Sequence, residues 1–336
     1  MIKINKSLLI CLILISIFLK CLCSNGDKTV FFKQCRQNCE RQNCSAGKRT
    51  DGIEFQEQAI KYYQQTLFDK LFLWNCVDEC QYGCMWRTVE VFKERGWAVP
   101  QFYGKWPFIR FMGLQEPASV YFSILNFVAH VRNIKRFRRE VRPDSPCYKL
   151  WHLFAFVCLN GWLWSIIFHA RDLPLTELLD YAFAYSMVLV VFYCMLLRML
   201  HRKSILLRGF ISLGVLSYYI NYFAYLSAGK FSYSTNMVAN VVTGVLGGLG
   251  WILWSFRVRH YRPYYRKIQT FFLLMGLSMS LELLDFRPIL WIIDAHALWH
   301  LSTAFLAPLF YSFVIEDCKI LRTEYKDKAF IFDKEI

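Results

Sequence analysis

Three histidines, a serine and an aspartate in this sequence are the residue types that metal-assisted hydrolysis requires. His296 and His300 are four residues apart, so on a helix both imidazoles lie on one face and can bind one metal ion. Ser165 and His169 share this spacing, and Asp180 follows them. Three imidazoles predict a catalytic zinc with an open position, a carboxylate can transfer protons, and a hydroxyl can stabilise an oxyanion. A histidine pair alone is more often a packing feature, so the prediction depends on helices that bring His169 to the same depth.

The elements that must position these residues are long apolar helices. The chain has 336 residues, of which 56% are hydrophobic and 19% charged, and this composition favours a membrane protein over a soluble or disordered one. A helix needs about 20 residues to cross a bilayer. Seven apolar stretches approach or reach this length: 118–131, 150–168, 173–197, 205–226, 231–256, 268–283 and 289–315. The predicted fold class is an all-α membrane protein with a seven-transmembrane helix bundle.

The first residues predict a secretory signal peptide. Lys3 and Lys6 precede an apolar run that ends in Cys21-Leu22-Cys23-Ser24, close to the small-residue pattern of a cleavage site. We assign residues 1–23 to this peptide, so the segment that follows is translocated into the lumen of the secretory pathway. An uncleaved anchor would leave the same orientation.

The net charge is +15, and the positions of the basic residues agree with this topology. With a luminal N-terminus, the three predicted cytosolic loops, around residues 132–142, 198–203 and 257–267, are all basic, as the positive-inside rule requires. The surplus charge therefore favours membrane surfaces and gives no support for nucleic-acid binding. In this topology His169, Asp180, His296 and His300 all lie near the luminal surface.

Six clustered cysteines predict a disulfide framework in the luminal segment, residues 24–116. They are Cys35, Cys39, Cys44, Cys76, Cys80 and Cys84, and their pairing is not determined by the sequence. A zinc site is the weaker alternative, because thiols oxidise in the secretory pathway. Asn43-Cys44-Ser45 is a candidate glycosylation site on Asn43.

Amphipathic patterns predict helices in this luminal domain over residues 56–73 and 77–93. The aromatic tract 96–107 suits either a membrane interface or an ordinary linker packed on the first membrane helix. The domain is predicted to cap the site or to receive a glycan.

Acidic residues precede the histidine pair. Asp294 lies two residues before His296, where a carboxylate could orient a ligand imidazole, and we predict this role for it. Asp285 and Arg287 suit an exposed ion pair in a turn, and the role of Glu282 stays open.

Three motifs along the chain have a family resemblance. They are Trp74-Asn75-Cys76 with Cys80, Tyr82 and Cys84, then Leu284-Asp285-Phe286 with Pro288, and Asp294-Ala295-His296-Ala297-Leu298-Trp299-His300. With them the sequence resembles the Per1-like family, membrane proteins that remodel the lipid of glycosylphosphatidylinositol (GPI) anchors. The membrane part is also similar to the wider superfamily that includes alkaline ceramidases and adiponectin-type receptors.

The resemblance implies a reaction for the five residues of the predicted site. Ser165, His169, Asp180, His296 and His300 match the superfamily's Ser, His, Asp, His, His pattern. The family implies a phospholipase A2-type step that removes the sn-2 acyl chain from the phosphatidylinositol of GPI-anchored proteins. We expect Zn²⁺ on the three histidines, proton transfer by Asp180, and oxyanion stabilisation by Ser165, for which a nucleophilic role is the weaker alternative.

Other functions fit parts of the sequence. Zinc chemistry cleaves amides as well as esters, so a ceramidase-like amidohydrolase is the nearest alternative. A seven-span receptor or a non-enzymatic scaffold for GPI biosynthesis are further candidates. Animal relatives favour the Golgi membrane over the endoplasmic reticulum, with the membrane domain at 117–315 and a cytosolic tail at 316–336 that contains Lys334, a fragment of a retrieval signal. The sequence does not determine the oligomeric state.

Overall fold

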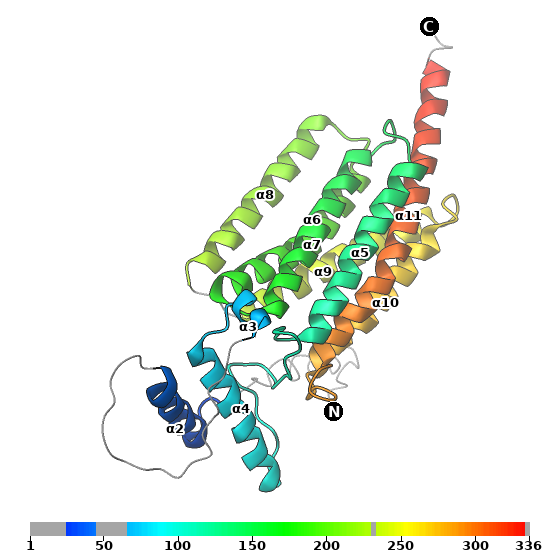
Figure 1. Ribbon diagram of the computed structural model, residues 1–336. Helices are drawn as coiled ribbons and strands as arrows, with labels where there is room; N and C mark the ends of the chain where they lie inside the picture. The colour runs from blue at the N-terminus through cyan, green and yellow to red at the C-terminus, as the bar shows by residue number, and fades with distance from the viewer. Residues whose placement is uncertain (1–24, 45–65, 230–232, 333–336) are drawn as a thin grey trace, which may run out of the picture. The chain divides into compact units, whose positions relative to one another are not determined.

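The computed structural model describes residues 25–44, 66–229 and 233–332, and these residues form helices joined by turns and three isolated β-bridges (Figure 1). The all-α prediction is confirmed for this part of the chain. The predicted signal peptide and Lys334 lie outside it. The chain divides into two compact units, Met1–Pro117 with Leu283–Ala295, and Ala118–Glu282 with His296–Ile336. The short segment Leu283–Ala295, predicted to be part of the membrane domain, thus groups with the first unit.

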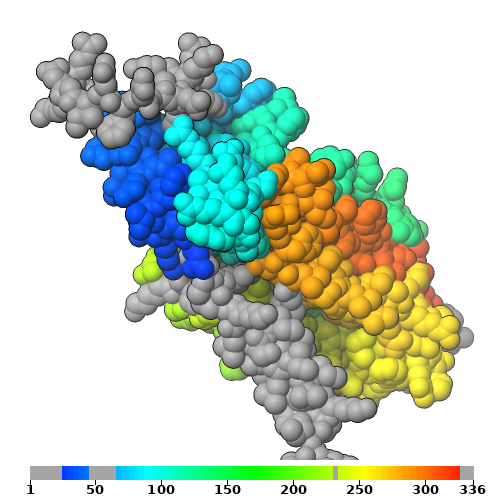
Figure 2. All heavy atoms as spheres, turned by 90° about the horizontal axis from the view of Figure 1, so that it is seen from below, coloured from blue at the N-terminus to red at the C-terminus, as the bar shows by residue number. Residues whose placement is uncertain are grey.

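The first unit is built around two helices joined by disulfides. Helix α2 (Val30–Cys39) continues into the π-helical turn η1 (Glu40–Cys44), and α4 spans Cys76–Glu94. The three disulfides Cys35–Cys84, Cys39–Cys80 and Cys44–Cys76 confirm the predicted framework and join the two segments in antiparallel register. Figure 2 shows α2 in blue beside α4 in cyan. Each bridge joins a turn of the α2–η1 segment to a turn of α4, so a small core is held covalently.

Asn43, the candidate glycosylation site, lies in the turn η1. Its side chain is exposed, and its Nδ2 donates a hydrogen bond to the carbonyl oxygen of Cys39 at 3.1 Å. Ser45, the third residue of the sequon, lies outside the described residues. Glycosylation of Asn43 stays a prediction.

Two predictions for the first unit need correction. Of the expected helix 56–73, the described part contains only α3 (Leu67–Leu71), which ends where Leu73 adopts a left-handed backbone with φ of 58°. Asp285 was expected in an exposed ion pair, but it is half-buried and accepts hydrogen bonds from the Trp106 indole at 2.7 Å and the Gln101 amide at 3.0 Å. These bonds tie the aromatic tract 96–107 into the first unit.

The second unit is a bundle of long helices (Figure 1). Each predicted apolar stretch overlaps one helix: α5 (Pro117–Glu140), α6 (Tyr148–Ala170), α7 (Pro174–Met199), α8 (Ile205–Ser227), α9 (Tyr233–Val258), α10 (Tyr265–Leu284) and α11 (Ala295–Phe332). In the described residues, four helices are long and apolar enough to cross a membrane, namely α6, α7, α9 and α11. That α5, α8 and α10 also span the bilayer remains a prediction, because their sequences are more polar or carry charges.

Helix α11 differs from the prediction at both ends. The expected start at Ile289 is wrong, because Leu290 and Trp291 have φ values of 54° and 62°, which a right-handed helix does not allow. The helix starts at Ala295 and continues to Phe332, so the residues assigned to a tail extend the helix. Arg322 pairs with Asp144 at 2.8 Å near this end.

The pairing of α6 with α7 determines which residues of the two helices lie at the same level near the loop that connects them. Gly161 on α6 leaves room for Met187 of α7, since an added Cβ would lie 2.5 Å from the Met187 sulfur. Nearer to the loop between the helices, the rings of Phe168 and Tyr181 have centroids 6.2 Å apart. This antiparallel register places Asp180 of α7 level with the last turn of α6.

Candidate metal centre

The second unit brings the three predicted histidine ligands together. His169 lies in the last turn of α6, and His296 and His300 lie in the first two turns of α11. One ligand atom from each of the three falls within 4.8 Å of the others, and the Nε2 atoms of His169 and His296 are 3.4 Å apart. His169 and His300 are buried and His296 is half-buried. The i, i+4 spacing on α11 therefore does place two imidazoles on the face that meets α6.

The outer nitrogens of two of these imidazoles already have partners. Nδ1 of His296 lies 2.6 Å from a carboxylate oxygen of Glu282, and Nδ1 of His300 lies 2.8 Å from the hydroxyl of Ser123. With Nδ1 occupied, Nε2 is the atom that each ring can offer to a metal. The sequence analysis predicted that Asp294 orients a ligand imidazole, and in the structure the carboxylate at His296 Nδ1 is that of Glu282. Asp294 belongs to the first unit, and its role stays a prediction.

Ser123 is a site residue that the sequence analysis missed. It connects the predicted Ser165 to the histidines, because its Oγ lies 3.1 Å from Ser165 Oγ and 2.8 Å from His300 Nδ1. The signal that could have found it is a buried polar stripe at helical spacing along α5, formed by Ser119, Ser123, Asn126, His130 and Asn133. Asn126 of this stripe donates to the carbonyl oxygen of His300 at 2.6 Å, which ties α5 to α11.

Asp180 lies on α7, half-buried. Met187, two turns later on the same face, packs against Gly161 of α6, so this face of α7 is the one directed at α6. Tyr181, the neighbour of Asp180, contacts Phe168, the neighbour of His169. The structure therefore places Asp180 at the level of His169, while its proposed part in the chemistry stays a prediction.

The donor set suits a zinc ion. Zinc binds imidazole nitrogens at about 2.0–2.1 Å in a tetrahedron, so two ligand nitrogens should be about 3.4 Å apart. The Nε2 atoms of His169 and His296 lie at this separation. A carboxylate on the outer nitrogen, as Glu282 provides for His296, is a usual partner of a metal-binding histidine.

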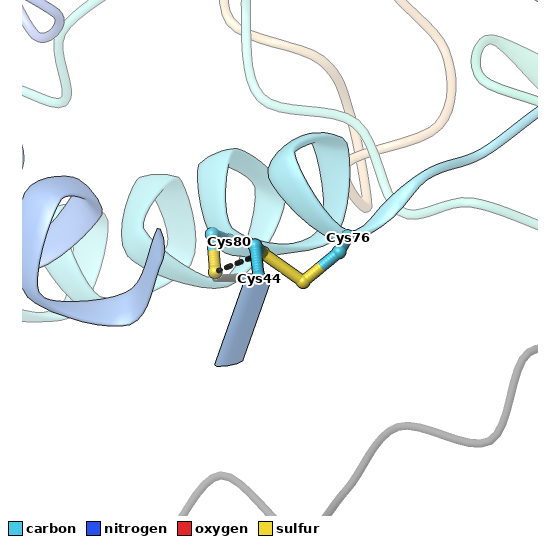
Figure 3. A group of neighbouring side chains, drawn as sticks. All are labelled: Cys44, Cys76 and Cys80. Carbon is cyan, nitrogen blue, oxygen red and sulfur yellow. Dashed lines mark hydrogen bonds between the residues drawn. A yellow bond between two sulfur atoms is a disulfide. The ribbon is translucent and has the colours of Figure 1, made fainter. Parts of the chain in front are cut away.

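A second group of potential ligands lies in the first unit (Figure 3). Cys44, Cys76 and Cys80 also place one sulfur each within 4.8 Å of the others. Cys44 is bonded to Cys76, and Cys80 is bonded to Cys39. Because a cysteine binds metals as a thiolate, these oxidised sulfurs do not form a zinc site.

Comparison with known proteins identifies relatives of this chain. The model of the Per1-like family matches residues 66–318. The chain is 65% identical over 305 residues to Post-GPI attachment to proteins factor 3 of Drosophila melanogaster, covering 91% of this chain and 92% of the relative. It is 42% identical over 296 residues to GPI-specific phospholipase A2-like PGAP3 of Xenopus tropicalis, covering 88% and 90%, and 39% identical over 309 residues to the Homo sapiens protein of that name, covering 91% and 92%. No solved structure matches. By sequence and by the extent of the match, the chain belongs to the Per1-like family.

Proposed function

We propose that this protein is a membrane hydrolase that removes the sn-2 acyl chain from the phosphatidylinositol of GPI-anchored proteins, a phospholipase A2-type reaction. The observation that carries the proposal is the cluster of three histidine nitrogens within 4.8 Å at the facing ends of α6 and α11. The names of the relatives, which refer to GPI attachment and to a GPI-specific phospholipase A2, support the substrate and the reaction class.

His169, His296 and His300 are the residues that would hold the zinc ion. When bound, zinc supplies Lewis-acid polarisation of the ester carbonyl and lowers the pKa of a coordinated water. Glu282 and Ser123 hold two of the ligand rings through Nδ1, so that the ligand nitrogens converge without a large rearrangement.

The hydrogen-bond chain on α5 and α6 supports a donor role for Ser165. If His300 offers Nε2 to the metal, its Nδ1 carries the proton and donates to Ser123 Oγ. We assign the Ser123 hydroxyl as the donor to Ser165 Oγ, which leaves the Ser165 proton to point elsewhere. This polarity favours Ser165 as a donor to the oxyanion that develops on the ester carbonyl, rather than as a nucleophile that must first lose its proton.

Asp180 is the proposed proton carrier. It takes a proton from the attacking water and returns it to the glycerol oxygen when the sn-2 ester bond breaks. The products are a free fatty acid and a lyso-phosphatidylinositol that remains on the anchor. The level of Asp180 beside the end of α6 supports this role.

We further propose the orientation and the compartment. The N-terminus faces the lumen and the C-terminus the cytosol, because the connections between α5 and α6, α7 and α8, and α9 and α10 are the basic ones. The site then opens toward the luminal leaflet, where GPI anchors are displayed. The Golgi membrane is the proposed location.

Lipid mass spectrometry of GPI-anchored proteins tests the proposal. Cells that lack this chain should retain unsaturated sn-2 chains, wild type should remove them, and an Asp180→Ala variant expressed at the same level should not. Asp144→Ala is the matched control, because Asp144 pairs with Arg322 at the far end of α11, and it should restore remodelling fully. Unchanged sn-2 chains in every sample would refute the reaction, and a change confined to ceramides would favour an amide hydrolase instead.

A further inference from the structure

Helix α3 of the first unit has inverted polarity. Asp69 is 4% exposed, whereas Leu67 and Leu71 are 80% and 70% exposed. The acid is turned inward because it closes a capping box with Thr66, accepting hydrogen bonds from its backbone nitrogen at 2.9 Å and its hydroxyl at 2.6 Å. Leucines are normally the buried residues and aspartates the exposed ones. The outer face of α3 is therefore suited to an apolar medium rather than to water.

A neighbouring turn enlarges this apolar surface. Gly113 lies directly against α3, since an added Cβ would be 2.8 Å from the Phe72 ring and 3.1 Å from the carbonyl oxygen of Phe68. The Trp74 indole also donates to the carbonyl oxygen of Gly113 at 2.8 Å. The turn is thus fixed beside α3 with its large apolar side chains outward. Together these side chains form an apolar patch, which consists of Leu67, Phe68, Leu71, Leu73, Phe111 and Met112.

The backbone presents two of these side chains in an unfavourable conformation. Leu73 and Met112 have φ values of 58° and 50°, in the left-handed region that residues with a side chain rarely occupy. Both side chains are exposed. A strained conformation that exposes an apolar side chain brings no gain from burial within the unit, which points to a surface that is covered by something else.

The position of the patch in the chain identifies what covers it. Helix α5 begins at Pro117, five residues after Met112, and five extended residues reach at most about 18 Å. The patch is therefore tethered close to the point where the chain enters its long helices, four of which have the length and composition of membrane spans. Lys70, exposed on α3, is a side chain whose stem can follow lipid while its charge reaches the headgroups.

We infer that the apolar patch inserts into the bilayer leaflet next to the first unit, as a membrane contact separate from the spanning helices. Six large apolar side chains on one short helix and one turn are the kind of surface that partitions into the interfacial region of a lipid bilayer. The inference does not depend on hydrolase activity, and its failure would leave the proposed reaction untouched.

Depth-dependent fluorescence quenching tests the inference on the full chain in lipid nanodiscs. Met112→Cys and Leu71→Cys are each labelled with an environment-sensitive fluorophore, with the unsubstituted chain as the background for its free cysteines. The controls are Val30→Cys, an exposed apolar position on α2 that is 68% exposed, and Glu90→Cys, an exposed polar position on α4. Nanodiscs with and without spin-labelled phospholipids are compared.

We expect spin-labelled lipid to quench most of the fluorescence at both patch positions and little of it at the controls. Fluorescence that is unchanged by the lipid at the patch positions would overturn the inference, whether the label is then in water or covered by protein. A second variant, Phe111→Ser/Met112→Ser, keeps the inference testable if one of the cysteine substitutions disturbs the local fold. With its three disulfides intact, it should lose the quenching at Leu71→Cys, and retained quenching would contradict insertion of the helix and the turn as one patch.

Discussion

The cysteine group of the first unit and the histidine group of the second have the same geometry and opposite chemistry. Each places three potential metal ligands within 4.8 Å. The sulfurs of Cys44, Cys76 and Cys80 are already joined in disulfides, whereas the imidazoles of His296 and His300 are uncharged-nitrogen donors whose Nδ1 atoms contact Glu282 and Ser123. Proximity of ligand atoms is therefore not sufficient for a metal site. The oxidation state of the ligands and the partners of their remaining atoms decide it.

The two regions also differ in what holds them in place. Three disulfides hold the small first unit, whose described residues include only a small buried apolar cluster. The histidines are held by packing between long helices and by hydrogen bonds from α5, such as that from Asn126 to the His300 carbonyl. Damage to one region should therefore spare the property that depends on the other.

The largest expected effect is the loss of the metal when a histidine ligand is removed. His296→Ala should reduce bound zinc from about one ion per chain to background and lower lipid remodelling by more than about a thousand-fold, because two imidazoles cannot hold a catalytic zinc. Elemental analysis of purified protein measures the zinc. His260→Ala, at an exposed histidine in the loop before α10, is the control and should retain both properties. Full zinc in His296→Ala would contradict the assigned ligand set.

Breaking a disulfide should lower stability and leave the bound zinc unchanged, in contrast to the loss of a histidine. A Cys39→Ser/Cys80→Ser variant should lower the free energy of unfolding of the first unit by about 2–5 kcal/mol, because it frees a cross-linked loop in the unfolded chain. Denaturant titration measures this loss, and zinc content should stay unchanged. Cys147→Ser, at a free cysteine, should change neither. If the zinc were lost with the disulfide, the metal would have to lie in the first unit.

Removal of the carboxylate behind His296 should weaken metal binding without abolishing it. Glu282→Ala should lower zinc affinity by about 10–100-fold, since His296 loses the hydrogen bond that orients it. Glu282→Gln keeps an acceptor and should have the smaller effect. Competition with a metal chelator measures both. Asp294→Ala separates the two candidate carboxylates, and a larger loss there than at Glu282→Ala would restore the role predicted from the sequence.

Ser123, which contacts His300 Nδ1, and Ser119 are a matched pair of test positions on α5. Ser123→Ala removes the hydrogen bond to Nδ1 and should weaken zinc binding by about tenfold. Ser119, one turn earlier on α5, is also buried, but its Oγ has no hydrogen-bond partner among the described residues, so Ser119→Ala should have no effect on the metal. Chelator competition on both proteins decides between them. Equal losses would mean that α5 acts through packing alone.

The smallest expected effect is a pH dependence confined to the first unit. Burial raises the pKa of Glu79 more than its ion pair with Arg110 at 2.6 Å lowers it. The folded state then binds this proton more tightly than the unfolded state, so its contribution to stability is present below about pH 4 and is lost as the pH rises through the raised value. Glu79→Gln should flatten this slope in denaturant titrations and leave zinc content unaffected. A slope unchanged by the substitution would assign it to other groups.

Local sequence signals predicted most of the helices and the three histidines that the structure brings together. Long apolar runs between basic residues placed α6 to α10 within about three residues, whereas α5 continues to Glu140, well past the predicted end at residue 131. The spacing of His296 and His300 indicated a shared face. The start of α11 was missed because the apolar residues Ile289 to Ile293 continue the hydropathy signal, although Leu290 and Trp291 have a left-handed backbone. The role of Glu282 was left open, because a lone acid near a helix end has no distinctive local pattern. Ser123 was missed although it belongs to the polar stripe at helical spacing along α5.

The sequence by itself determined the all-α class, the oxidised state expected of the six cysteines, and the residue types available for hydrolysis, since these follow from composition, periodicity and compartment. Only the tertiary structure decided which cysteine bonds to which, which groups hold the histidine rings, and that the leucines of α3 face outward. The reason is physical: periodicity is a property of a single segment, whereas partners depend on the register between segments that are far apart in the chain.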